Sequence, residues 1–163
     1  MSDEVDRLVA AWSRERPDLD VTPMRVLSRV TRLARHLDRA RRTAFAAHAL
    51  ETWEFDVLSA LRRAGRPYQL SPGTLLRETM VTSGTMTNRV DRLAARRLVE
   101  RRPDPEDRRG VLVRLTAQGR QSVDAALEAL LSRERELLTG LPARDQQRLA
   151  ALLRELTTPF DDP

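Results

Sequence analysis

The chain has 163 residues and a net charge of +5, contains no cysteine, and takes all 29 of its basic residues as arginine. Its length suits one domain with its own core, and the lack of cysteine excludes disulfides, thiol catalysis and cysteine-ligated metals. No run of about 18 apolar residues is present, so we expect no membrane span. The acidic N-terminus lacks an apolar signal core, and we therefore expect a cytoplasmic protein.

The charge is distributed unevenly along the chain. Residues 1–21 carry three arginines and six acids, whereas residues 22–50 carry seven arginines and one acid. Residues 71–116 carry ten arginines and six acids. A basic middle beside an acidic end indicates a polyanionic partner, and arginine forks pair well with phosphate and with guanine edges.

Helical periodicity fills the N-terminal part of the chain. A short helix is expected over residues 3–16, ended by Pro17. Thr22 and Pro23 offer an N-cap and a first helical residue for a long second helix. A third helix is expected from near Thr52 to Arg63.

The middle of the chain predicts two short helices and a hairpin. Gly65 stops the third helix, and the sequence RPYQ is expected to form a loop. Ser71 and Pro72 then start a fourth helix that reaches about Thr79. Thr82 caps a fifth helix that runs to about Arg97.

Two strands are expected next, over residues 98–102 and 111–115, joined by the turn PDPEDRRG. Thr116 caps a long helix over residues 117–138, which Gly140 closes. Pro142 opens the last helix. The order of elements predicts a mainly α protein with a winged helix-turn-helix, the shape that places one helix in the DNA major groove.

The fifth helix has two different faces. Apolar residues lie at core spacing, and the opposite face carries small polar groups and arginine: Ser83, Thr85, Thr87, Asn88, Arg89 and Arg92. Small groups at a helix N-terminus allow close approach to phosphate, and Asn and Arg read adenine and guanine. The alternative is a solvated face on a core helix. The order of the three elements favours DNA binding.

The hairpin carries a more specific pattern. Asp107, Arg109, Val113, Leu115 and Thr116 fit D-x-R-x-x-x-V-x-L-T. On this pattern the chain resembles the MarR family of transcriptional regulators over about residues 20–157. The resemblance implies that Asp107 braces the wing and that Arg108 or Arg109 enters the minor groove, the alternative being solvated turn charges. We also expect Ser71, at the start of the fourth helix, to belong to the DNA-binding surface.

The family fold implies a homodimer with interleaved terminal helices. The sequence agrees, because these helices carry apolar stripes that the winged module is too small to cover, the alternative being that they fold back on their own chain. We therefore expect a single MarR-like domain over residues 1–163. Residues 1–50 and 117–163 would supply dimerisation helices around a winged helix-turn-helix over residues 51–116. Two such modules would sit about one DNA turn apart on a pseudopalindromic operator.

The extra N-terminal helix with Trp12 resembles the urate-responsive branch of the MarR family, the PecS/HucR-like proteins. That resemblance implies an anionic effector held by Trp12, Asp56, Arg89 and Arg101. Trp stacks and paired arginines bind a delocalised anion, while Asp56 would pair with Arg89 when the ligand is absent. The alternatives are a core role for Trp12, a structural Asp56–Arg89 pair, phosphate contact by Arg89 and a surface Arg101.

The sequence predicts a regulator that is not an enzyme. His36 and His48 share no helix face, no carboxylate cluster suggests a metal site, and no catalytic or nucleotide fingerprint is present. We expect no cofactor and no membrane partner, only duplex DNA, a second copy and a small aromatic anion such as urate. The alternatives are a regulator that responds to a phenolic acid, and a non-specific architectural or adaptor protein.

Overall fold

The structure is a computed structural model that describes residues 2–107 and 109–161. The chain forms two compact units, residues 1–43 and residues 44–163, and the boundary lies within one long helix. The first unit holds α1 (Glu4–Glu15) and most of α2 (Met24–Ala46). The second unit holds the remaining elements and the hydrophobic core.

In the first unit, α1 is fixed to the first half of α2 by charge. Asp3 caps α1 by accepting the backbone N–H of Asp6, and Asp6 returns the bond to the N–H of Asp3. The Arg29 guanidinium then bonds both carboxylates at 2.8–2.9 Å. Arg29 and these backbone bonds hold the pKa of Asp3 and of Asp6 below the usual range, the backbone bonds being the larger cause. Helix α1 therefore carries its own docking contact for α2.

The second unit begins with three helices and a strand. They are α3 (Thr52–Arg63), β1 (Gln69–Leu70), α4 (Pro72–Thr79) and α5 (Ser83–Ala95). Gly65 follows α3 with φ +76°, as the predicted stop requires. The prediction of a loop over RPYQ was wrong at its end, because Gln69 belongs to β1. This two-residue strand exists through pairing with a distant strand, which local sequence does not reveal.

The hairpin strands are β2 (Val99–Pro103) and β3 (Val111–Leu115), and the sheet order is β1-β3-β2 with antiparallel pairing. Strand β2 thus begins one residue later than expected, at Val99, because a tight turn at residues 96–98 follows the end of α5 at Ala95. Arg97 adopts a left-handed φ of 58°, and the N–H of Leu98 donates to the carbonyl of Leu93. This is the hydrogen-bond pattern of a Schellman end with Arg97 where glycine is usual.

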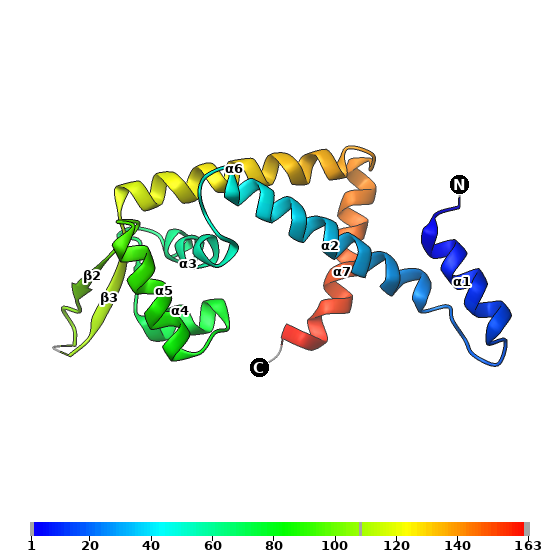
Figure 1. Cartoon of the computed structure of the whole chain (residues 1–163), viewed down its shortest axis with the longest axis horizontal. Coiled ribbons are helices and arrows are strands. Elements are labelled where there is room, and N and C mark those ends of the chain that lie inside the picture. The colour runs from blue at the N-terminus through cyan, green and yellow to red at the C-terminus, as the bar shows by residue number, and fades with distance from the viewer. Residues whose placement is uncertain (1, 108, 162–163) are drawn as a thin grey trace. The chain divides into compact units, whose positions relative to one another are not determined.

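Two long helices complete the chain, α6 (Ala117–Leu138) and α7 (Ala143–Asp161). Thr116 caps α6 as predicted, since its hydroxyl accepts the N–H of Gly119 at 2.9 Å. Gly119 is required there, because an added Cβ would lie 2.0 Å from the Leu98 carbonyl oxygen. This close approach fixes the start of α6 against the beginning of the wing (Figure 1).

The core of the second unit lies between α3, α4, α5, the sheet and the first half of α6. Phe45 and Phe55 stack at its edge, with ring centroids 4.0 Å apart. The fully buried side chains include Leu58, Leu61 and Leu75. A mainly α winged helix-turn-helix, the predicted fold class, is therefore confirmed, and α5 and the hairpin rest on one shared core.

Candidate nucleic-acid interface

The helix-turn-helix consists of α4 and α5. The Ser71 hydroxyl caps α4 by accepting the N–H of Thr74 at 3.2 Å. The turn between the helices passes through Met80, whose φ of 50° is left-handed. Helix α5 buries Met86, Val90 and Leu93 against the core, and these residues fix which face it presents.

The open face of α5 carries the groups that the sequence singled out. Arg89 is half-buried. The other five are exposed: Ser83, Thr85, Thr87, Asn88 and Arg92. Thr82 occupies the N-cap position, but the expected side-chain cap is wrong, since its hydroxyl bonds the Thr85 hydroxyl at 2.9 Å instead. The Thr82 hydroxyl therefore does not occupy the backbone N–H groups in the first turn of α5. Free N–H groups at a helix N-terminus are the groups that bind an anion.

Helix α3 supports the arginines of α5 through a residue that the sequence analysis missed. The indole of Trp53 lies beneath Arg92 and Arg89, with guanidinium carbons 4.7 and 5.5 Å from the ring centroid. Glu51 accepts the indole N–H at 2.7 Å and bonds Arg92 at 2.9 Å. The two guanidinium groups are therefore oriented before any partner arrives.

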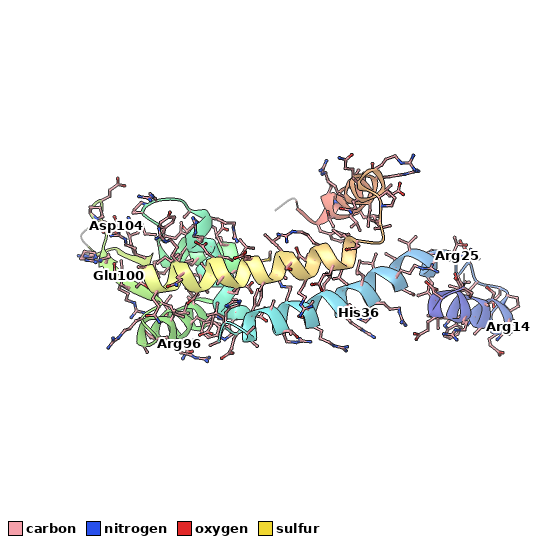
Figure 2. All side chains as sticks on the ribbon, turned by 90° about the horizontal axis from the view of Figure 1, so that it is seen from above. Arg14, Arg25, His36, Arg96, Glu100 and Asp104 are labelled. Atoms are coloured by element: carbon pink, nitrogen blue, oxygen red, sulfur yellow. The ribbon has the colours of Figure 1, made fainter. Side chains whose placement is uncertain are left out.

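A buried ion pair fastens the far end of α5 to the same turn of α3. Glu54 is only 1% exposed, and both its carboxylate oxygens accept from Arg96 at 2.5 and 2.6 Å. Glu54 also accepts the backbone N–H of Glu51, which completes a capping box on α3. The Glu-x-x-Glu spacing before an apolar run was a signal for this box that the sequence analysis did not use. Figure 2 labels Arg96 at this end of α5.

The wing is a short hairpin, and backbone hydrogen bonds join the described residues of its turn. The N–H of Asp104 donates to the Gly110 carbonyl at 3.0 Å, and the N–H of Gly110 donates to the Asp107 carbonyl at 2.8 Å. The Asp107 carboxylate accepts the N–H of Arg109 at 2.9 Å. Arg109 is exposed, and Arg108 lies outside the described residues. Figure 2 shows Glu100 and Asp104 along this hairpin. The Asp107 contact suits the expected brace, whose role in DNA binding stays a prediction.

The four expected effector residues fall in both units. Trp12 lies on α1 of the first unit and is 45% exposed. In the second unit Asp56 is half-buried on α3, and Arg101 on β2 pairs with Asp91 of α5 at 2.6 Å. Arg89 stacks on the Trp53 ring. A common pocket for these residues, and the Asp56–Arg89 pair, stay predictions.

Two further observations concern the described part of the chain, residues 2–107 and 109–161. No group of three or more histidine, aspartate or glutamate side chains gathers there in a way that could hold a metal ion. No helix within those residues is both long and apolar enough to cross a membrane.

A helix-turn-helix followed by a two-stranded wing defines a winged helix-turn-helix protein. Comparison with known proteins identifies the group. Residues 50–110 match the family model described as the MarR family. The chain is 37% identical to the HTH-type transcriptional regulator PecS of Dickeya dadantii, over 92% of this chain and 90% of the relative. It is 33% identical to the repressor NicR of Pseudomonas putida, over 85% and 88%. The chain belongs to the MarR family.

Solved structures agree with this assignment. A mutant of Escherichia coli MarR complexed with operator DNA matches with a TM-score of 0.68 and 28% identity, over 85% of this chain and 99% of that chain. A MarR family transcriptional regulator from Streptomyces coelicolor matches with a TM-score of 0.69 and 26% identity, over 86% and 96%.

Proposed function

We propose that this protein is a sequence-specific transcriptional regulator that binds duplex DNA in the cytoplasm, and that it acts as a repressor. The observation that carries the proposal is the open face of α5, whose polar groups are exposed while its apolar face is locked into the core. Relatives named as transcriptional regulators and repressors, and a structural neighbour solved with operator DNA, support it.

The chemistry of the open face suits a DNA groove. Asn88 offers the paired donor and acceptor that match an adenine edge, and Arg92 offers the fork that matches guanine. The hydroxyl groups at the start of α5 (Ser83, Thr85) and α4 (Ser71), with Thr87, suit phosphate contacts that set the register. Arg109, and Arg108 with it, would extend the contact from the wing.

The protein is proposed to work as a homodimer. Several helices outside the winged module leave apolar side chains exposed, more than an isolated chain in water would favour. On α2, α6 and α7 these include Val26, Leu27, Val30, Leu33, Leu127, Leu131, Leu137, Leu138, Leu149, Leu152, Leu156 and Phe160. Burial against a second copy would cover them, and twofold symmetry would present two copies of α5 to a pseudopalindrome.

The proposed effector is a small aromatic anion, urate or a related purine in the first instance. Arg89 and Arg101 supply cationic forks, Trp12 a stacking face and Asp56 a counter-charge. Arg89 lies on the half-buried edge of the α5 surface, so a ligand that recruits it would compete with DNA. A phenolic acid is the alternative effector.

The first experiment is an anisotropy titration of the wild-type protein on the DNA just upstream of its own gene. Arg92→Ala should cost about 1–3 kcal/mol on that DNA and flatten the preference over random sequence. The matched control is Arg63→Ala, which removes the same charge from an exposed site. Arg63 is the last residue of α3 and pairs with Glu78 of α4. Equal losses from both variants, or equal losses of Arg92→Ala on random DNA, would contradict base reading by Arg92.

The same titration with urate and a panel of aromatic acids tests the effector. If urate releases the wild-type protein from DNA, and releases Asp56→Asn and Trp12→Phe less well, the four-residue site is supported. Release by a phenolic acid alone would discard the purine and keep the regulator. Binding that shows only salt-dependent affinity, with no preferred sequence, would favour an architectural protein.

A further inference from the structure

A second basic site lies at the end of the sheet away from the wing turn. It is a cavity of about 390 Å³ between the loop before β1, the end of β3 and the first turn of α6. Its lining includes Arg66, Pro67, Tyr68, Arg114, Thr116 and Arg120. These residues come from three separate elements, and none of them belongs to the DNA face of α5 or to the expected effector set.

The charge of this cavity is not balanced by the protein. Within the described ranges 2–107 and 109–161, no carboxylate pairs with Arg66, Arg114 or Arg120, and none lines the cavity. The neighbouring carboxylates are engaged elsewhere. Asp124 bonds Arg62 at 2.8 Å, and Glu100, opposite Arg114 on β2, bonds Arg102 at 2.9 Å. Three arginines therefore line one cavity without a paired carboxylate, and their summed positive potential favours an anion there.

Tyr68 holds this cluster together. Its carbonyl accepts the N–H of Leu115 at 2.9 Å, which ties the loop to the end of β3. The Arg62 and Arg120 guanidinium carbons lie 5.0 and 5.9 Å from its ring centroid. Hydrogen bonding from Arg120, and then from Arg66, lowers the pKa of the Tyr68 hydroxyl. Arg66 and Arg120 thus line the cavity together with Tyr68, where a ligand oxygen would meet them.

The backbone of Tyr68 is strained in a way that suits a built site. Its φ of 63° lies in the left-handed region, which a bulky side chain rarely adopts. Such conformations cost on the order of 1–3 kcal/mol and persist where the surrounding structure imposes them, often at ligand clamps. In this conformation the Tyr68 ring lies against the guanidinium groups of Arg62 and Arg120.

We propose that the cavity formed by Arg66, Arg114 and Arg120 around Tyr68 binds a phosphate group. Guanidinium forks match phosphate oxygens two at a time, and a doubly charged anion offsets more of the local charge than a carboxylate does. The first turn of α6 adds partial positive charge at the cavity wall. The phosphate comes either from a small phosphorylated molecule or from the backbone of DNA that flanks the operator.

The geometry separates this site from the wing tip. Strand β3 runs from Val111 beside the turn to Leu115 beside the cavity. Four steps of about 3.3 Å place the two ends about 13 Å apart. A ligand in the cavity would therefore not replace the contact of Arg109 with DNA, and the site adds to the proposed function without depending on it.

The test uses the full-length protein and pyrophosphate, with sodium chloride at matched ionic strength as the reference. Wild-type protein should show saturable stabilisation by pyrophosphate in thermal unfolding and a defined stoichiometry in calorimetry. Arg66→Gln/Arg120→Gln should weaken that affinity by at least about tenfold, equal to about 1.4 kcal/mol. Arg63→Gln, the loss of an exposed arginine outside the cavity, should leave it unchanged. Circular dichroism checks the fold, and the single variant Arg120→Gln replaces the double variant if that one does not fold.

A second arm distinguishes the two sources of phosphate. Operator fragments with and without flanking base pairs are titrated with the wild-type protein and the cavity variant. A loss of affinity confined to the longer fragment assigns the site to flanking DNA, whereas equal affinities with pyrophosphate binding intact assign it to a free phosphorylated ligand. Absence of saturable pyrophosphate binding together with no dependence on flank length would overturn the proposal. The pyrophosphate arm needs no DNA, so its result stands whether or not the protein proves to be a regulator.

Discussion

Replacing Arg96 by alanine removes the only charge that the structure places on the buried Glu54 carboxylate within the described residues. Removing one partner of a buried pair costs about 3–5 kcal/mol, because the other charge stays in a poor solvent. Arg96 is itself 40% exposed, so water gains access to Glu54 and the cost falls to the lower end, about 3 kcal/mol. For a chain of this size we expect the melting temperature to fall by about 6–12 °C.

The assay is urea unfolding followed by circular dichroism at one fixed protein concentration, because dimerisation would shift the midpoint with concentration. Glu54→Gln should cost less, about 1–2 kcal/mol, since it leaves an arginine that water can reach. In the double variant no charge is left buried, so its cost should fall short of the sum of the single costs by about 2 kcal/mol. Additive costs, or a loss below about 1 kcal/mol for Arg96→Ala, would refute the argument.

Two further perturbations test the packing of each unit. Gly119→Ala should destabilise by about 3 kcal/mol in the same urea assay, because its Cβ would meet the Leu98 carbonyl. The control Gly84→Ala meets nothing within 4 Å and should stabilise by up to about 1 kcal/mol, and equal effects would contradict the close approach. In the first unit, the pKa values of Asp3 and Asp6 are lowered. Their contribution to the stability of the α1–α2 contact is therefore present above the ordinary pKa of 3.8 and is lost as the pH falls through the lowered pKa values. Limited proteolysis of α1 should therefore accelerate below about pH 4 and, at pH 7, in Arg29→Gln, while a rate independent of pH would exclude the ion pairs as the docking contact.

The element boundaries were predictable where one local residue sets them. Gly65 supplies a left-handed stop, and the hydroxyls of Ser71 and Thr116 cap the helices that follow. Strand β1 was not predictable, since two residues carry no periodicity and the strand depends on pairing with Arg114 and Val113. The end of α5 was misplaced because Arg97 takes a backbone conformation that sequence rules reserve for glycine.

The site divides in the same way. The polar face of α5 could be read from helical spacing, because Met86, Val90 and Leu93 fix the buried side. The support from Trp53 and Glu51 could not, since it joins residues about 40 positions apart whose contact depends on how α3 crosses α5. Only the tertiary arrangement shows that the arginines of the recognition face already have partners.

The attachment of α5 to α3 bears on how such a protein tells one operator from another. Arg89, Arg92 and Arg96 fasten the C-terminal half of α5 to the start of α3. A helix held by these contacts, with Met86, Val90 and Leu93 buried in the core, cannot tilt or slide in the groove by itself, so the winged module moves as one piece. In the proposed homodimer, affinity would then also depend on the separation of the two modules. Operators with one base pair inserted between half-sites should consequently be discriminated more sharply than those with a single substituted base.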